Sequence, residues 1–373
     1  MEVPFYKYIS ELPHHSNVSD VLDGEDINQV ELLEEEFCSY VDSKYALATS
    51  SGTSALHLAM LALDLKRGDK IVCSVNTHPA VPEVVRHFDA EPIFIDIDEN
   101  NFHIDLDKLE VYLNKNKNKK LKAVIITLMG GVNINLDRLY DMASKCNVKV
   151  VLDASEALGS EYQDKKIGSV CADITCFDFS SHLKKNVCSG GMLVCDDEDI
   201  IQRARLLANH GIKRDENTLE YIYDVIDIGN DYIMSDLSAA YIRAGIDKID
   251  QNIKKQQEIA KVYNKELQGV EHVEVPKIEN ENFSYNLYMI KIDKNRDSFA
   301  LDMKKEGVQT GLHYIPLHLL SYYKAKYELR VNDYPNALRY YQQILSLPIY
   351  PSMSDEEVEY VCKIIKKVAK TKV

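Results

Sequence analysis

The chain has 373 residues, and its 45% hydrophobic and 28% charged content is typical of a globular protein with two or more structural units. Its 44 Lys and Arg against 59 Asp and Glu give a net charge of −15, which argues against nucleic acid or an anionic membrane as a partner. The absence of a signal-like N-terminus and of any apolar run of about 18 residues, with eight scattered cysteines, favours a cytoplasmic protein with reduced thiols.

From residue 45 to 196, short apolar runs alternate with helical periodicity. The pattern predicts a mostly parallel sheet with helices on both faces, because βαβ crossovers produce this alternation. We expect strands at Ile71–Val75, Pro92–Ile97, Ala123–Leu128, Val148–Leu152, Ile174–Phe179 and Met192–Cys195, and helices at Ser54–Leu63, Pro82–His87, Leu136–Cys146 and Asp197–Asn209.

Beyond residue 230 the pattern becomes more helical. One long helix is predicted over Asp236–Leu267, with Ser235 as its N-cap. A strand at Tyr285–Ile292 and helices at Ser298–Glu306, Tyr334–Leu345 and Ser354–Ala369 follow. We therefore predict an α/β chain with a large domain over residues 1–250, including an N-terminal arm over 1–25, and a smaller C-terminal α+β domain over 251–373.

Three segments carry groups suited to chemistry. Between a strand and a helix, Gly52 and Thr53 can direct backbone N–H groups at an anion, although a plain helix cap explains this turn equally well. Asp153 ends an apolar strand, where an acid can hold a protonated ring nitrogen or simply cap a helix. Lys184 and Lys185 lie in a loop before Gly-Gly; a lysine there can form a Schiff base, although paired lysines are more often solvated.

The order and spacing of these three segments match one cofactor. Pyridoxal phosphate (PLP) needs a phosphate cup, an acid on its pyridine nitrogen and a lysine on its aldehyde. This arrangement is typical of fold-type-I PLP enzymes, so the segments together predict a PLP site.

At this point the sequence resembles the DegT/DnrJ/StrS family of sugar aminotransferases, from about residue 26 to the C-terminus. The resemblance rests on motifs spread along the chain: Ser50-Ser-Gly-Thr-Ser-Ala-Leu-His57, Pro92-Ile-Phe-Ile-Asp-Ile-Asp98, Asp153-Ala-Ser-Glu-Ala157, His210-Gly-Ile212, Met234-Ser-Asp-Leu-Ser-Ala-Ala240, Gly311-Leu-His-Tyr-Ile-Pro-Leu-His318 and Leu345-Ser-Leu-Pro348. It implies an aspartate-aminotransferase-like fold and a homodimer with shared active sites. It also implies PLP-dependent transfer of an amino group from L-glutamate to a nucleotide-linked keto-sugar.

The resemblance also implies roles for single residues. Gly52 and Thr53 would meet the cofactor phosphate, and Asp153 would pair with the pyridine nitrogen. Glu156 stands where the family has a Gln or His against the ring, and His78 replaces the ring-stacking aromatic residue. The family's Tyr-Asn-Tyr-Arg from the partner subunit reads Asn230-Asp-Tyr-Ile233 here, with Asn230 as the substitute phosphate ligand.

The lysine loop departs from the family's Phe-Ser-Phe-His-x-x-Lys-Asn. A gapped alignment makes Lys185 the Schiff-base lysine and Ser180 the phosphate ligand, with Lys184 as the alternative lysine. An ungapped alignment puts Leu183 and Asp178 at those two positions. We prefer the gapped alignment, because leucine cannot form an imine and an aspartate would repel a phosphate.

The expected function is PLP-dependent transamination for amino-sugar and surface-polysaccharide biosynthesis. His313 and His318 are candidate sugar or diphosphate ligands, and each is equally compatible with a structural role. Two alternatives remain open. One is a lysine-independent sugar dehydratase in which His182 is the base, and the other is a non-catalytic sugar-binding or regulatory protein.

Overall fold

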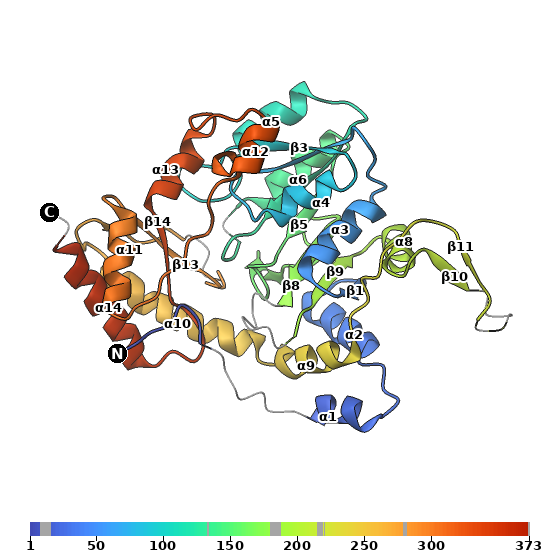
Figure 1. The fold of residues 1–373 in the computed structure, drawn as a ribbon, viewed down its shortest axis with the longest axis horizontal. Coiled ribbons are helices and arrows are strands. Elements are labelled where there is room, and N and C mark those ends of the chain that lie inside the picture. The colour runs from blue at the N-terminus through green and yellow to red at the C-terminus, as the bar shows by residue number, and fades with distance from the viewer. Residues whose placement is uncertain are drawn as a thin grey trace.

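The computed structural model describes residues 1–7, 16–132, 134–179, 188–214, 219, 221–278 and 282–371. The largest element within these residues is a seven-stranded sheet of order β1-β9-β8-β5-β4-β2-β3 (Figure 1). β9 is antiparallel to both of its neighbours, β1 and β8, and the other neighbouring pairs are parallel, so the predicted mostly parallel sheet is confirmed. The strands are β1 (Tyr45–Thr49), β2 (Lys70–Ser74), β3 (Glu91–Ile95), β4 (Leu121–Thr127), β5 (Lys149–Asp153), β8 (Ile174–Asp178) and β9 (Gly191–Cys195).

Helices cover both faces of this sheet. Successive residues of a strand point to opposite faces, so Val151 of β5 joins one hydrophobic core while Val150 and Leu152 join the other. The first core includes α3 (Gly52–Ala62), α4 (Ala80–Arg86) and α8 (Glu198–Ala208). The second includes α2 (Gln29–Val41), α5 (Leu106–Lys115), α6 (Leu136–Lys145) and α9 (Asp236–Ile246). Burial on both faces explains why the strands read as continuous apolar runs.

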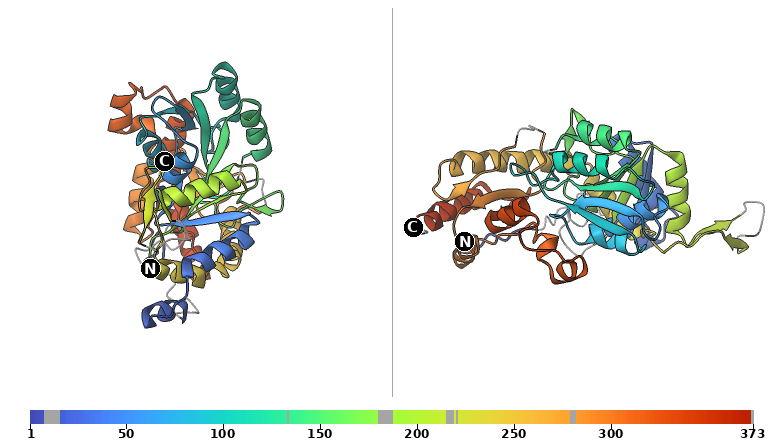
Figure 2. Two further views of the ribbon diagram at one scale, coloured as in Figure 1. Left: turned by 90° about the vertical axis from the view of Figure 1, so that its right-hand side faces the viewer. Right: turned by 90° about the horizontal axis from the view of Figure 1, so that it is seen from above.

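A smaller α+β part lies beside the sheet, as predicted (Figure 2). Its antiparallel sheet has the order β12 (Val273–Glu274), β13 (Tyr288–Ile292) and β14 (Ile344–Leu347). This sheet shares a hydrophobic core with α10 (Ile249–Leu267), α11 (Arg296–Lys305) and α14 (Asp355–Ala369). Val3 belongs to the same core and exchanges backbone hydrogen bonds with Gly307 and Gln309. The division of the chain at residue 250 stays a prediction.

Two predicted elements differ from the structure. Ser235 is the N-cap of α9, but the single long helix is divided into α9 and α10 at Asp247 and Lys248. There the Lys248 N–H bonds to the carbonyl oxygen of Gly245, three residues back, at 3.1 Å, so the regular four-residue spacing of helical hydrogen bonds is interrupted. Gly245, just before the break, weakens the helix as well. The strand predicted from Tyr285 begins at Tyr288 instead, since Tyr285 has a left-handed φ of 52° that a strand does not accept.

A hairpin of β10 (Ile212–Arg214) and β11 (Tyr223–Val225) extends away from the body of the molecule (Figures 1 and 2). The remaining elements are α1 (Ser16–Asp23), β6 (Glu161–Tyr162), β7 (Lys165–Lys166), the 3-10 turn η1 (Leu317–Leu319), α12 (Ser321–Lys326) and α13 (Pro335–Gln343). No helix in the described part of the chain has the length and apolar character needed to cross a membrane.

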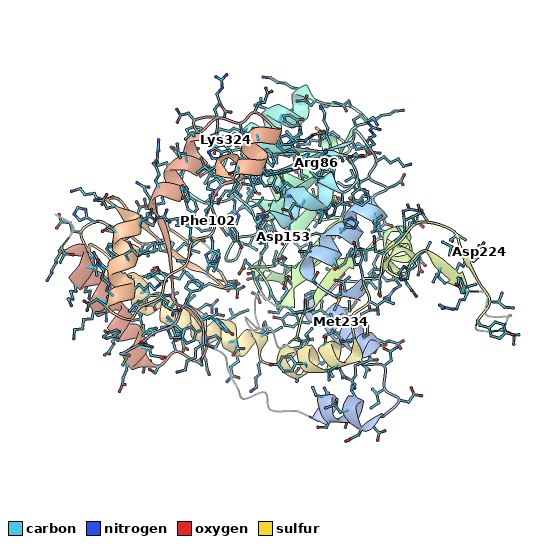
Figure 3. The ribbon with its side chains drawn as sticks, viewed as in Figure 1. Arg86, Phe102, Asp153, Asp224, Met234 and Lys324 are labelled. Atoms are coloured by element: carbon cyan, nitrogen blue, oxygen red, sulfur yellow. The ribbon has the colours of Figure 1, made fainter. Side chains whose placement is uncertain are left out.

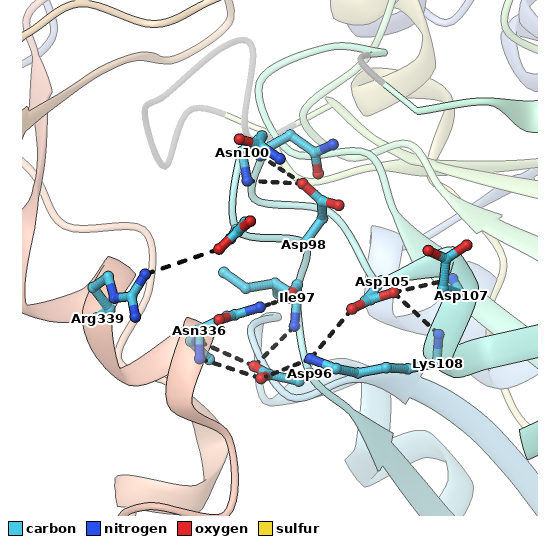
Figure 4. A network of polar contacts seen from close by, with 12 residues as sticks. Asp96, Ile97, Asp98, Asn100, Asp105, Asp107, Lys108, Asn336 and Arg339 are labelled. Carbon is cyan, nitrogen blue, oxygen red and sulfur yellow. Dashed lines mark hydrogen bonds and ion pairs between the residues drawn. The ribbon is translucent and has the colours of Figure 1, made fainter. Parts of the chain in front are cut away.

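The buried carboxylate of Asp96 links the large sheet to the C-terminal part (Figure 4). It follows β3 and accepts hydrogen bonds from the backbone N–H groups of Asn336 at 3.2 Å and Ala337 at 3.0 Å. α13 therefore receives its N-terminal cap from a residue about 240 positions earlier in the chain. Lys108 donates to the same carboxylate at 3.2 Å, which balances its charge.

We expect Asp96→Ala to lower the free energy of unfolding by about 3 kcal/mol, because the first turn of α13 loses its cap and Lys108 loses a buried partner. Urea denaturation followed by circular dichroism measures this loss. Arg339→Ala is the matched control in the same helix, since the Arg339–Glu99 pair is 4.0 Å long and 65% exposed on both sides. Equal stability of the two variants would contradict a capping role for Asp96.

Candidate active site

The candidate site is centred on Asp153, the last residue of β5. Its side chain lies near the middle of the molecule, at the carboxyl edge of the sheet (Figure 3). One carboxylate oxygen accepts from the Ser155 hydroxyl at 2.6 Å and from the Ser155 N–H at 3.2 Å. The other accepts from the Thr127 hydroxyl at 3.2 Å. Hydroxyl groups therefore orient this carboxylate from both sides.

Burial gives Asp153 unusual electrostatics. The side chain is 3% exposed, and burial raises the pKa of its carboxyl while the bonds from Ser155 and Thr127 partly oppose that rise. Thr127 is itself held by the Thr77 hydroxyl at 2.6 Å. A cation placed against Asp153 would offset the cost of burying its charge, so the site favours a positively charged partner.

The N-terminus of α3 lies at the same sheet edge. Ser51 is the N-cap, and its hydroxyl accepts from the Ser54 N–H at 3.1 Å. The Gly52 N–H points at the carboxylate of Asp178, the last residue of β8, at 3.3 Å. A Cβ built on Gly52 would lie 2.5 Å from the Cβ of Asp178, so only glycine fits here. The helix end predicted to bind phosphate therefore has an acid beside it, while Thr53 is exposed.

Tyr314 connects these groups, and sequence reasoning missed it. Burial raises the pKa of its hydroxyl, and the nearby carboxylates of Glu156, Asp153 and Asp178 raise it further. The His78 ring lies edge-on to Tyr314, with 5.7 Å between ring centroids. His78 also lowers the pKa of Asp153 electrostatically. The structure thus brings His78, Asp153 and Glu156 together around Tyr314, and their roles at a cofactor stay predictions. The aromatic residue within the Gly311–His318 motif was the only signal for Tyr314.

The other predicted residues have different positions. His313 lies beside Tyr314, and its Nδ1 is 2.9 Å from the Ser346 hydroxyl. His318 is fully buried against Tyr334; burial lowers the pKa of its imidazole, which favours a structural role. Asn230 is exposed, and its backbone pairs with Leu207 and His210, outside the group around Asp153. Ser180, His182, Lys184 and Lys185 lie outside the described residues, so their roles stay predictions.

His103 lies next to Thr127 and makes the stability of the folded chain sensitive to acid. Its ring is 1% exposed, with Nδ1 3.3 Å from the carbonyl oxygen of Thr127, and burial lowers its pKa from 6.5 to about 4. Below pH 6.5 the unfolded chain binds a proton that the folded chain excludes, so stability falls with pH down to about 4. We expect a loss of about 3 kcal/mol, which His103→Asn should remove from urea-denaturation profiles while the similarly shifted His57 still titrates. An unchanged pH profile in that variant would contradict this.

Comparisons of the sequence and of the structure with known proteins agree with each other. The sequence profile of the DegT/DnrJ/EryC1/StrS aminotransferase family matches residues 14–366. The chain is 32% identical to the spore coat polysaccharide biosynthesis protein SpsC of Bacillus subtilis, over 92% of this chain and 90% of that protein. It is 32% identical to the UDP-4-amino-4,6-dideoxy-N-acetyl-beta-L-altrosamine transaminase of Campylobacter jejuni, over 92% and 91%. The putative sugar aminotransferase Spr1654 of Streptococcus pneumoniae superposes with a TM-score of 0.90 at 25% identity, covering 100% of this chain and 98% of that one.

Proposed function

Because the chain belongs to the DegT/DnrJ/EryC1/StrS aminotransferase family, which uses pyridoxal phosphate, we propose that it moves an amino group from L-glutamate to a nucleotide-linked keto-sugar. The similarity to a transaminase of a UDP-linked sugar supports this substrate class. The similarity to a spore coat polysaccharide biosynthesis protein supports a role in making surface polysaccharide. All eight cysteines are free, which supports action in the reducing cytoplasm.

The observation that carries the proposed chemistry is the buried, hydroxyl-oriented carboxylate of Asp153. It suits the protonated pyridine nitrogen of the cofactor, because each charge offsets the cost of burying the other. When bound, the cofactor serves as an electron sink for a carbanion. Asp153 would keep the ring nitrogen protonated, and the side chains of His78 and Tyr314 would border the space in front of Asp153. Lys185 is proposed to hold the cofactor and to move protons at the reacting carbon.

One experiment tests this proposal. The purified protein is incubated with PLP, reduced with borohydride and digested, and the modified peptide is mapped by mass spectrometry. A pyridoxyl group on Lys185 or Lys184, together with 2-oxoglutarate formed from L-glutamate, supports the transaminase. Bound PLP with no lysine adduct would instead support the dehydratase with His182 as base. Absence of both binding and adduct would leave a sugar-binding protein.

We also propose a homodimer with shared sites. The β10–β11 hairpin and the segment after it expose a row of apolar side chains, among them Tyr221 at 76% and Ile228 at 85%. An exposed apolar surface of this kind typically marks a protein interface. A second copy of the chain is the proposed partner, because the hairpin leads directly into Asn230, which the resemblance assigns to the partner's phosphate site.

If so, Tyr223→Asp with Ile226→Asp should convert the dimer to a monomer, since truncating a central interface residue costs about 2 kcal/mol or more. Light scattering after size-exclusion chromatography measures the mass. Asp224→Asn in the same strand is the control and should stay dimeric. A doubly substituted chain that remains a dimer would place the interface elsewhere.

A further inference from the structure

Asp178 places a carboxylate at the helix end that the family uses for phosphate. Its Oδ2 is 3.3 Å from the Gly52 nitrogen, at the first residue of α3. The Ser54 N–H of the same turn is already bound by the Ser51 hydroxyl. The Gly52 N–H, one of the two N–H groups assigned to the cofactor phosphate, is therefore already bound from within the chain.

The position of Asp178 is set by the sheet. Asp178 pairs with Gly191 in the antiparallel β8–β9 ladder. A Cβ built on Gly191 would lie 2.4 Å from the Ser51 carbonyl, so β9 and the start of α3 are packed backbone to backbone. Because the strand ladder and this close packing fix its Cα, the carboxylate can leave the Gly52 N–H only by rotating its side chain.

Among the residues that the structure describes, a phosphate dianion at this helix end would have carboxylates beside it. Asp178 and Gly52 are in contact, and Asp178, Asp153 and Glu156 all act on the hydroxyl of Tyr314. Asp153 suits the cationic end of the cofactor, whereas Asp178 would lie beside its phosphate if the phosphate bound at Gly52. A carboxylate and a phosphate that share one N–H group repel each other.

We propose that Asp178 determines how strongly this enzyme binds the phosphate of its cofactor, by holding the Gly52 N–H and opposing the second negative charge. The inference rests on the proposed function, since it takes the PLP site to lie at this sheet edge. The chain should therefore bind pyridoxine 5′-phosphate only slightly more tightly than pyridoxine, which lacks the phosphate. The inference concerns the phosphate of the cofactor and not the diphosphate of a nucleotide-sugar substrate.

Calorimetric titration of the full chain with pyridoxine 5′-phosphate and with pyridoxine tests this without activity or lysine chemistry, because neither compound has an aldehyde. Asp178→Ser and Asp178→Asn should bind pyridoxine 5′-phosphate about 10- to 100-fold more tightly than the unaltered chain, as expected when a phosphate gains a charge-assisted hydrogen bond. Their affinity for pyridoxine should stay unchanged. Asp173→Asn, just before the opposite end of the same strand, is the control and should alter neither affinity.

Circular dichroism melting identifies any variant that fails to fold. Because serine and asparagine differ in size, the inference can still be tested with one of the two variants at position 178 if the other does not fold. Unchanged affinity for pyridoxine 5′-phosphate in the folded variants would overturn the inference, as would an equal gain for pyridoxine. Those results, together with a pyridoxyl-lysine from borohydride reduction, would leave the proposed function intact. No binding of either compound by any variant, and no adduct, would overturn both.

Discussion

Lys185→Ala is expected to abolish measurable transamination, with a loss of kcat of about 10²- to 10⁴-fold or more, because one lysine both holds the cofactor and transfers the proton. Single-turnover formation of 2-oxoglutarate from L-glutamate in PLP-loaded protein measures the effect without knowledge of the sugar. Lys184→Ala, one residue away, is the matched control and should retain most of the activity. The two lysines are adjacent in the sequence and carry the same charge, so a general electrostatic effect would influence both variants alike.

The outcomes distinguish Lys185 from Lys184 as the Schiff-base lysine. Loss of activity in Lys184→Ala with retention in Lys185→Ala would transfer the role to Lys184. Full activity in the double variant would show that neither lysine takes part in the chemistry. The ungapped alignment puts Asp178 at the position of the family's phosphate serine. The contact between Asp178 and Gly52 agrees with the alignment in this one respect.

Local sequence patterns predicted the elements that position the site. The apolar run before Asp153 is β-branched and buried on both sides, so it predicted β5 and placed an acid at the carboxyl edge. Ser54–Leu63 predicted α3, and Ser354 caps α14 through a reciprocal bond with Glu357. In these cases the signal lies within a few residues of the element that it predicts.

Features that depend on distant residues could not be predicted in this way. Asp178 and Gly52 are 126 positions apart, and Asp96 and Ala337 are 241 apart. No local periodicity reports such contacts, because the sheet order brings the residues together. The division of the predicted long helix at Lys248 and the left-handed φ of Tyr285 are similar, because in both places the structure departs from a good local pattern.

Asp153→Asn should lower kcat by about 10²- to 10³-fold, the usual cost of losing one oriented electrostatic contact to a developing charge. The amide keeps the shape of the side chain but has no negative charge to hold a proton on the ring nitrogen. Its NH₂ group also faces donors, because the Thr127 and Ser155 hydroxyls both donate to Asp153. The variant is thus expected to bind the cofactor less tightly and to shift the absorption spectrum of bound PLP.

Asp173→Asn serves as the control for this change because it also removes a carboxylate, in this case one that lies just before β8 and is hydrogen-bonded to β5. Asp173 accepts the Val150 N–H at 2.8 Å and pairs with Lys149 at 2.7 Å, but it lies at the amino edge of the sheet, away from Asp153. An effect through the stability of β5 would therefore appear in both variants. An effect through the ring nitrogen would appear only at 153, because, of Asp153 and Asp173, only Asp153 lies at the carboxyl edge with Thr127. Equal kcat in Asp153→Asn and the unaltered chain would exclude Asp153 as the partner of the ring.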